Sequence, residues 1–245
     1  MKYEIKIKRF NPITNESYFQ NYKVDLDEKF TILEAIEYIK NYIDSTLTYR
    51  AFCKSAICGS CAMVVNGESK LTCKMNAIDN LIDGVLEISP LKHFDIIKDL
   101  VVNQDKGFDK LKQTIPYIIP KTPTKENEEF LIPPKEEQTY DKQSECILCM
   151  ACYSDCPAVE TDENYFGPFG FSKILRFVND SRDEISSKRI DKTMEGNIFS
   201  CIECQACILA CPKGLKPQFD IKTLQFKAQS QGYQNPNFQD FGTFF

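Results

Sequence analysis

Apolar and polar residues alternate along the beginning of the chain. The alternation runs through residues 2–10 and returns in residues 18–26. A period of two is typical of β-strands. We therefore predict two strands joined by a turn region at residues 11–17, the first carrying Tyr3, Ile5 and Ile7 and the second Tyr18, Tyr22, Val24 and Leu26.

The next stretch has the period of a helix. Thr31 and Glu34 have the spacing of a capping box, in which each side chain hydrogen-bonds a backbone amide of the other residue. Two strands followed by a helix are the opening of a β-grasp, a sheet wrapped around one helix. The apolar residues of this predicted helix recur on one face: Ile32, Ala35, Ile36, Ile39 and Ile43.

Further along, Asn66-Gly67 is a strong signal for a tight hairpin turn. The apolar residues Val85, Leu86 and Ile88 then predict a closing strand. Residues 115–138 are rich in proline and charge and have no period, so we expect an extended crossing segment rather than a helix or a sheet.

The second half of the chain indicates helices. Residues 171–180 carry apolar side chains at helical spacing, and Pro217 stands where a helix can begin. The last fifteen residues are rich in Gln, Asn and Phe, and they fit a docking tail and plain disorder equally well. We predict three parts: a sheet domain at 1–105, the crossing segment at 106–140 and a mainly helical domain at 141–245.

Composition limits the functions open to the chain. Its 245 residues have room for two domains, and 42% of them are hydrophobic and 27% charged. The net charge of −5 and the lack of a basic stretch interleaved with aromatic residues give nucleic-acid binding no support. No apolar run reaches the ~18 residues of a membrane helix, and the charged N-terminus is not a signal peptide. We expect synthesis in the cytoplasm, with export alongside a partner left open.

The twelve cysteines fall into three groups of four. The first group has the spacing C-x4-C-x2-C followed by a later cysteine, which is the plant-type binding loop for a [2Fe–2S] cluster. Small residues between these cysteines let the backbone wrap closely, and the predicted hairpin would fold the last cysteine back beside the loop. The ligands predicted for this cluster are Cys53, Cys58, Cys61 and Cys73.

The other eight cysteines form two runs with identical spacing, C-x2-C-x2-C-x3-C-P. In bacterial-type ferredoxins such a run holds a [4Fe–4S] cubane, and its fourth cysteine ligates the other cluster. This rule assigns one cubane to Cys146, Cys149, Cys152 and Cys211, and the other, distal cubane to Cys156, Cys201, Cys204 and Cys207. The fold class is then α+β: a β-grasp [2Fe–2S] ferredoxin-like domain followed by a mainly helical bacterial-ferredoxin-like domain.

Structural zinc is the alternative for these groups, because C-x2-C pairs also bind zinc. Structural zinc is bound by four ligands that come from two separated pairs. Each run here adds a third and a fourth cysteine directly after its first pair, which a zinc site does not require. Buried thiols without metal are the alternative for the first group. His93, the only histidine, has a structural role by default, since thiolates already fill every cluster. We expect Arg50, Arg176 and Arg182 to form ion pairs on a helix surface or between domains. We expect Phe166, Phe169 and Phe171 to lie in the core.

With its cysteines placed, the chain resembles the iron–sulfur subunit of succinate dehydrogenases and fumarate reductases over nearly its whole length. Beyond the cysteines, the resemblance rests on residues 44–50, 90–102, 167–168, 176–183 and 211–217. It implies a β-grasp domain docked on an FAD-bearing catalytic subunit and a helical domain facing the membrane or an acceptor subunit. The chain would then relay electrons and carry no catalytic residue of its own.

Two departures from the better-known members narrow the resemblance. Those members lack the cysteine that corresponds to Cys204 and hold a [3Fe–4S] cluster there, whereas Cys204 predicts [4Fe–4S] here. They also build a quinone pocket from Trp and His residues, but this chain has no Trp, and Ile202 follows Cys201. In both respects the chain resembles the branch that contains the non-classical succinate:quinone reductases and the methylmenaquinol:fumarate reductases. Within this branch we favour the methylmenaquinol:fumarate reductases, so the resemblance implies a fumarate reductase.

In that branch the third subunit is cysteine-rich and soluble, and a haem-bearing membrane anchor is absent. The resemblance implies a complex peripheral at the cytoplasmic membrane, with its face open and quinone reached through the complex. Two alternatives stay open: a classical succinate dehydrogenase subunit with a haem anchor, and a free-standing multi-cluster ferredoxin.

Overall fold

The computed structural model describes residues 2–25, 27–121 and 129–236. Its contacts divide the chain into two compact units, and each is described by itself. Unit 1 comprises residues 1–106, 147–155 and 209–214, and unit 2 comprises 107–146, 156–208 and 215–245. The predicted boundaries at 105 and 140 therefore stay predictions, because the chain passes between the units several times.

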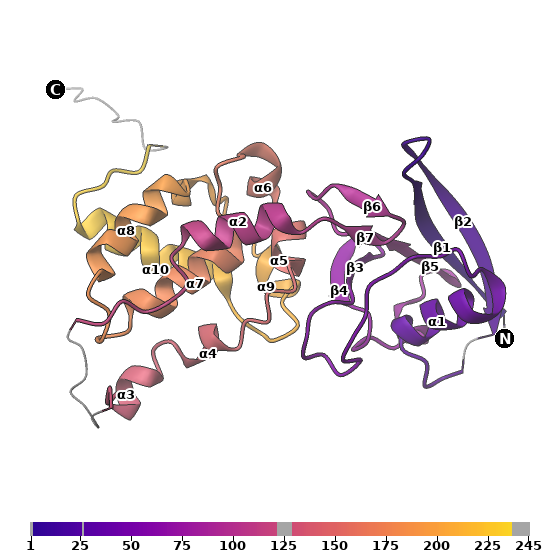
Figure 1. The fold of residues 1–245 in the computed structure, drawn as a ribbon, viewed down its shortest axis with the longest axis horizontal. Helices are drawn as coiled ribbons and strands as arrows, with labels where there is room; N and C mark the ends of the chain where they lie inside the picture. The colour runs from indigo at the N-terminus through magenta and orange to yellow at the C-terminus, as the bar shows by residue number, and fades with distance from the viewer. Residues whose placement is uncertain (1, 26, 122–128, 237–245) are drawn as a thin grey trace. The chain divides into compact units, whose positions relative to one another are not determined.

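Unit 1 is built on a mixed five-stranded sheet with the order β2-β1-β5-β3-β4 (Figure 1). Strands β1 and β5 are parallel, and the other neighbours are antiparallel. A second, two-stranded sheet pairs β6 with β7. The strands are β1 (Lys2–Asn11), β2 (Glu16–Asp25), β3 (Ala62–Val65), β4 (Glu68–Leu71), β5 (Val85–Ser89), β6 (Ile96–Lys98) and β7 (Val101–Val102).

The first two strands form the predicted hairpin, but both are longer than predicted, so only residues 12–15 are left for the turn. Tyr3 pairs with Val24 and Ile5 with Tyr22 across the ladder. Leu26, assigned to the second strand from sequence, lies outside the described residues. The Asn66-Gly67 hairpin is confirmed: both residues have positive φ, 49° and 87°, as a two-residue type I′ turn requires.

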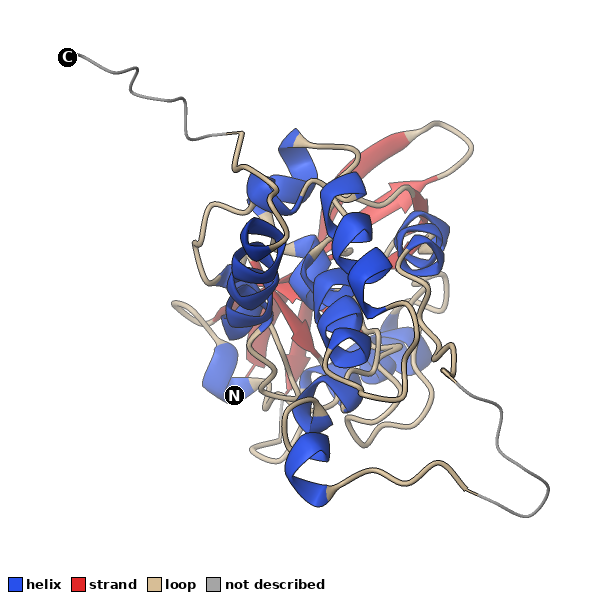
Figure 2. Cartoon of the chain, turned by 90° about the vertical axis from the view of Figure 1, so that its left-hand side faces the viewer, coloured by secondary structure: helices blue, strands red, loops and turns tan. Residues whose placement is uncertain are grey.

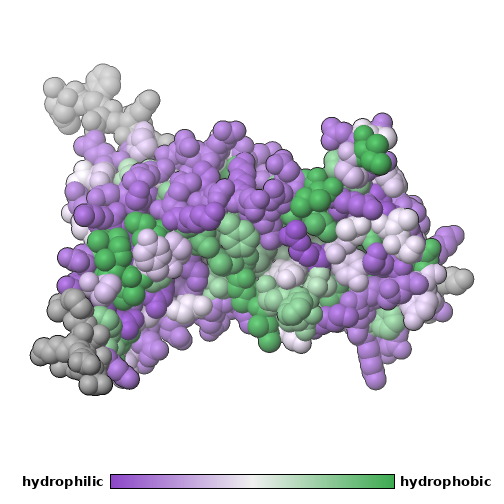
Figure 3. Space-filling view, viewed as in Figure 1, coloured by the Kyte–Doolittle hydropathy of each residue, from purple (hydrophilic) through white to green (hydrophobic). Residues whose placement is uncertain are grey.

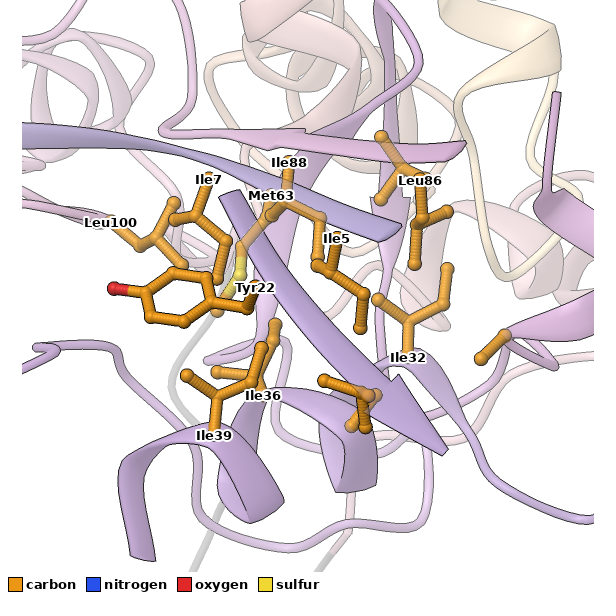
Figure 4. Packing of buried hydrophobic residues seen from close by; sticks show 14 of the residues in the cluster. Ile5, Ile7, Tyr22, Ile32, Ile36, Ile39, Met63, Leu86, Ile88 and Leu100 are labelled. Carbon is orange, nitrogen blue, oxygen red and sulfur yellow. The ribbon is translucent and has the colours of Figure 1, made fainter. Parts of the chain in front are cut away.

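The helix α1 (Ile32–Tyr38) begins with the predicted capping box. The Glu34 amide donates to Thr31 Oγ1 at 3.2 Å, and the Thr31 amide donates to Glu34 Oε2 at 2.7 Å. Figure 4 shows the apolar face of this helix packed on side chains of the sheet, which closes the core of a β-grasp. The predicted fold class, α+β, is confirmed.

Ile43 corrects the predicted apolar face. The helix passes at Ile39 into a π-helical turn (Ile39–Ile43), where the Asp44 amide reaches back to Ile39 O at 2.7 Å. A π turn adds a residue to the helical repeat, so the 3.6-residue period no longer places Ile43 over the sheet. Its side chain is 47% exposed, whereas Ile39 is fully buried.

Replacing Thr31 with alanine should lower the free energy of unfolding by about 1 kcal/mol, because the Glu34 amide loses its side-chain partner. Thr223→Ala is the control. Its hydroxyl donates to Phe219 O within a helix and caps no amide, so its loss should change little. Urea unfolding measures both. Equal effects of the two substitutions would contradict the cap assignment.

Unit 2 is helical (all helices of the chain are blue in Figure 2). Helix α7 is at its centre and packs against α10, α8 and α4. Its buried face carries Phe169, Phe171, Ile174 and Leu175. The helices of the second half are α2 (Asp105–Gln113), α3 (Pro134–Glu137), α4 (Asp141–Ser144), α5 (Ala151–Ser154), α6 (Pro157–Thr161), α7 (Pro168–Val178), α8 (Ser186–Glu195), α9 (Ala206–Leu209) and α10 (Pro217–Ser230), with 3-10 turns at Ile78–Asn80 and Ile198–Ser200.

The proline-rich segment differs from the extended chain that was predicted. It contains the short helix α3, and its first part is anchored within unit 2. Arg189, fully buried on α8, donates to Ile115 O at 2.6 Å and to Tyr117 O at 2.7 Å. Ile119 O accepts from the Glu184 amide at 2.7 Å. Residues 122–128 of the segment, and 237–245 of the predicted tail, lie outside the described residues.

The described surface carries both polar and apolar residues. Hydrophilic residues occupy much of the face drawn in Figure 3, with smaller apolar areas between them. None of the helices in the described part of the chain combines the length and the hydropathy needed to cross a bilayer.

Candidate functional site

The four cysteines of the first group meet in unit 1. The amides of Ser55, Ile57 and Cys58 all donate to Cys53 Sγ, at 3.3–3.4 Å. The Ala56 amide donates to Cys73 Sγ at 3.3 Å, so the hairpin does return Cys73 to the loop. The Thr72 amide bonds Cys61 O at 3.2 Å and fixes this return.

The thiols of this loop differ in acidity. The pKa of Cys58 is lowered to about 6, first by the Ser60 hydroxyl and then by backbone amides at Cys53 and Ser60. Burial raises the pKa of Cys61 to about 11. Because metal ligands bind as thiolates, loading a cluster here would release a proton from Cys61.

The backbone of the loop is shaped to hold an anion. Lys54, Ala56 and Gly59 have positive φ of 55°, 55° and 76°. Such left-handed residues turn successive amides to one side, in the nests that bind phosphates and iron–sulfur clusters. A non-glycine residue pays about 1–2 kcal/mol for this conformation, so two of them within one short loop indicate a functional constraint.

The two repeated runs share the same backbone conformation. In the first run, Leu148 and Met150 flank Cys149 with φ of 52° and 65°. In the second, Glu203 and Gln205 flank Cys204 with φ of 56° and 63°. The middle cysteine therefore stands between two left-handed residues in both runs. The identical cysteine spacing thus corresponds to an identical loop.

Four cysteines of the distal group surround one pocket in unit 2. Cys156 comes from the start of α6, Cys207 from α9, and Cys201 and Cys204 from the loop that joins the 3-10 turn at Ile198–Ser200 to α9. Tyr165, Gln218 and Ile221 complete much of the lining. Cys156 and Cys207 are buried, whereas Cys204 is exposed. The pocket is therefore closed on one side and reaches the surface of the unit at Cys204.

Burial dominates the acidity of this group. Burial, together with a smaller contribution from neighbouring cysteines of the group, raises the pKa of Cys156 to about 11 and that of Cys207 to about 12. The pKa of Cys201 is also raised by burial, although the Tyr165 hydroxyl acts in the opposite direction. The mutual effects of these thiols show that they lie within electrostatic range of one another.

The four cysteines of the remaining group are divided between the two units. Cys149, Cys152 and Cys211 belong to unit 1, and Cys146 belongs to unit 2. In unit 1, the Ser69 amide donates to Asp155 Oδ2 at 2.7 Å, and the Ser69 hydroxyl contacts Ser154 Oγ at 2.7 Å. Lys92 forms an ion pair with Asp155 at 3.0 Å. These bonds fasten the segment that carries Cys149 and Cys152 to strand β4 and the loop after β5.

The residues of both complete groups fit iron–sulfur clusters. Their donors are thiols, their loops expose amides towards sulfur, and one group encloses a pocket. Among the residues that the structure describes, no three His, Cys, Asp or Glu side chains are arranged around a single-ion site. All twelve cysteines remain proposed ligands on the strength of their spacing and loop conformation, and the first and distal groups also on the strength of proximity within one unit.

Other residues singled out from sequence have structural surroundings. Phe166, Phe169 and Phe171 are buried, as predicted. Arg176 and Arg182 both pair with the buried Asp180, at 3.1 Å and 2.7 Å. Sequence reasoning missed Tyr165, which lines the distal pocket. It stands beside the predicted Phe166, but no motif distinguishes it from a core tyrosine.

Two family models match the chain. A 2Fe–2S iron–sulfur cluster binding domain matches residues 4–109, and a 4Fe–4S dicluster domain matches residues 142–215. The first match spans the cysteine loop of unit 1. The second spans both repeated runs.

Curated relatives cover almost the whole chain. A fumarate reductase iron–sulfur subunit of Mycobacterium tuberculosis is 33% identical over 91% of this chain and 92% of its own length. A mitochondrial succinate dehydrogenase iron–sulfur subunit of Arabidopsis thaliana is 33% identical over 93% of this chain and 75% of its own. An iron–sulfur protein of Methanocaldococcus jannaschii, described as uncharacterized, is 37% identical over 96% of this chain, which spans only 45% of that relative.

A solved structure shares the fold. A chain of the Mycobacterium smegmatis Sdh1 complex in the apo form superposes with a TM-score of 0.87, covering 96% of this chain and 98% of that one at 21% identity. Together with the two domain matches and the curated relatives, this places the chain in the succinate dehydrogenase/fumarate reductase family, as an iron–sulfur subunit.

Proposed function

We propose that this chain relays electrons between an FAD-containing subunit, which interconverts succinate and fumarate, and quinone or a quinone-linked subunit. The observation that carries the proposal is the presence of three cysteine quartets in a chain of this family. Two of the quartets are gathered within single units, on loops whose amides face sulfur or around a common pocket.

The residues supply ligands and surroundings. Bound clusters of these types accept and release one electron at a time, and a series of them can divide the electron pair of a flavin. Cys53, Cys58, Cys61 and Cys73 would hold [2Fe–2S]. The repeated runs would hold two [4Fe–4S] clusters, on Cys146, Cys149, Cys152 and Cys211, and on Cys156, Cys201, Cys204 and Cys207. Loop amides and burial would set their potentials.

The family branch is part of the proposal. Cys204 is present, Ile202 follows Cys201, and the chain has no Trp. These features favour a fumarate reductase whose third subunit is cysteine-rich and soluble over one with a haem membrane anchor. The complex would lie peripherally at the cytoplasmic membrane. A classical succinate dehydrogenase subunit and a free-standing ferredoxin are the competing candidates, and co-purification with a flavoprotein separates the latter from our proposal.

The chain purified without oxygen, together with its natural partners, is expected to contain about ten irons and ten acid-labile sulfides per copy of this chain. Zinc at the same positions would give no sulfide. Preparations loaded with zinc and lacking sulfide would overturn the proposal. The same samples should contain a flavoprotein in equal amount.

Cys204 provides a check on the distal cluster. About nine irons, with a three-iron signal in the paramagnetic resonance of the oxidised protein, would mean that a [3Fe–4S] cluster is present despite Cys204. Replacing Cys204 with alanine is the matched control, because it removes one ligand and should create that signal where the unmodified chain lacks it.

A further inference from the structure

Tyr165 places a hydroxyl group in the distal pocket. The residue lies between α6 and α7 and is only 1% exposed. Its ring packs against Phe171 with the centroids 5.2 Å apart. With Cys156, Cys201, Cys204 and Cys207, it lines the same pocket.

No atom in the described part of the chain meets the distance and angle of a hydrogen bond with this hydroxyl. A buried hydroxyl without a partner costs about 1–3 kcal/mol. The group with which it does interact is the side chain of Cys201, and Cys156 and Cys207 also lie within electrostatic range. Among the groups that act on this hydroxyl, the side chain that can accept its hydrogen bond is therefore Cys201.

Tyr140 shows what a merely structural tyrosine looks like in the same unit. It is also buried, and its hydroxyl also lacks a partner among the described residues. Its ring lies under the Arg176 guanidinium at 4.8 Å, and the charged groups acting on it are Asp180, Arg182, Arg176 and Glu136. No cysteine is among them. Both tyrosines therefore have a buried hydroxyl, but only the hydroxyl of Tyr165 lies near thiols.

We propose that the Tyr165 hydroxyl donates a hydrogen bond to sulfur at Cys201 and thereby raises the reduction potential of the distal cluster. A reduced cluster carries one more negative charge than an oxidised one, so a donor aimed at its sulfur stabilises the reduced form more. The inference rests on the proposed ligation by Cys156, Cys201, Cys204 and Cys207. It makes Tyr165 a residue that tunes the last cluster.

The test compares Tyr165→Phe with Tyr140→Phe in the full chain, assembled with its partners and loaded with all clusters. Redox titration followed by low-temperature paramagnetic resonance gives the midpoint potential of each cluster. For Tyr165→Phe we expect the ratio of reduced to oxidised distal cluster at a fixed ambient potential to fall by up to about tenfold, which is a shift of about 59 mV for one electron. The other two clusters should keep their potentials, and Tyr140→Phe should move none.

An unchanged distal potential in Tyr165→Phe, or an equal shift in Tyr140→Phe, would overturn the inference while leaving the proposed function intact. Absence of iron and sulfide from the unmodified chain would instead refute the proposed function.

A second measurement covers the case in which Tyr165→Phe does not take up the distal cluster. Fluorotyrosine is incorporated at position 165 of the otherwise unmodified chain. Its hydroxyl is a stronger hydrogen-bond donor than that of tyrosine, so the potential of the distal cluster should rise. A constant midpoint potential of the distal cluster would mean that Tyr165 makes no such bond and would also overturn the inference.

Discussion

Replacing Gly59 with alanine should destabilise unit 1 by about 2–5 kcal/mol and lower its iron content, because two penalties coincide there. Gly59 has φ of +76°, a conformation that costs an alanine about 1–2 kcal/mol. A Cβ at this position would also lie 2.8 Å from Cys149 Cβ, 3.0 Å from Cys149 Cα and 3.2 Å from Ile147 O. The obstacles are mostly backbone, so one of two cysteine-bearing loops must move.

Gly67→Ala is the matched control. Gly67 has φ of +87°, and an added Cβ would meet nothing within 4 Å. It therefore shares the backbone penalty without the steric one, and it should keep full iron. Iron and sulfide assays, with thermal unfolding, measure the difference. If Gly59→Ala retained all its iron and matched Gly67→Ala in stability, the steric clash expected between the two loops would be disproved.

Replacing Arg189 with methionine should cost unit 2 about 3–5 kcal/mol, since it leaves a buried carboxylate without its charge partner. Arg189 Nε and Nη2 donate to the two oxygens of Asp183 at 2.8 Å and 2.7 Å, and both side chains are fully buried. Burial by itself would raise the pKa of Asp183, but hydrogen bonds from Arg189 and the Ile119 amide outweigh it and hold the pKa below its usual value. The substitution also removes two donors from the carbonyls of Ile115 and Tyr117.

Lys192→Met on the same helix is the control. Lys192 pairs with Glu195 at 2.7 Å on the surface, where an ion pair contributes at most ~1 kcal/mol. The double variant Arg189→Met/Asp183→Asn should recover part of the loss, because it removes the stranded charge while leaving an acceptor for the Ile119 amide. Denaturant unfolding measures all three. Equal effects of Arg189→Met and Lys192→Met would disprove the role of the buried pair.

Local signals in the sequence predicted local structure well. The capping box at Thr31 and the hairpin at Asn66-Gly67 depend only on neighbouring residues, and both are confirmed. Pro217 begins α10, whose Ile221 and Leu224 are buried. The cysteine spacing likewise indicated loops that the structure shows to be alike.

One failure has a local cause, and the others involve contacts between residues far apart in the sequence. Ile43 followed the helical period, but a π turn displaced it. Arg9 continues the alternation of β1 onto its buried face, where Asp99 and Asp44 pair with it at 2.8 Å and 2.6 Å. No sequence pattern reveals partners 90 residues away. Tyr165 was missed for the same reason, because its significance comes from cysteines on other segments.

The division of the cysteine-bearing segments has a consequence for how the protein is made. Unit 1 is completed by residues 209–214, which follow Lys106 by about 100 residues. A ribosome that adds roughly 5–20 residues per second would take on the order of 5–20 s to reach them. We therefore expect the cluster proposed to use Cys211 to be inserted only after the chain through residue 214 has left the ribosome, while the proposed Cys53–Cys73 site can receive its iron much earlier.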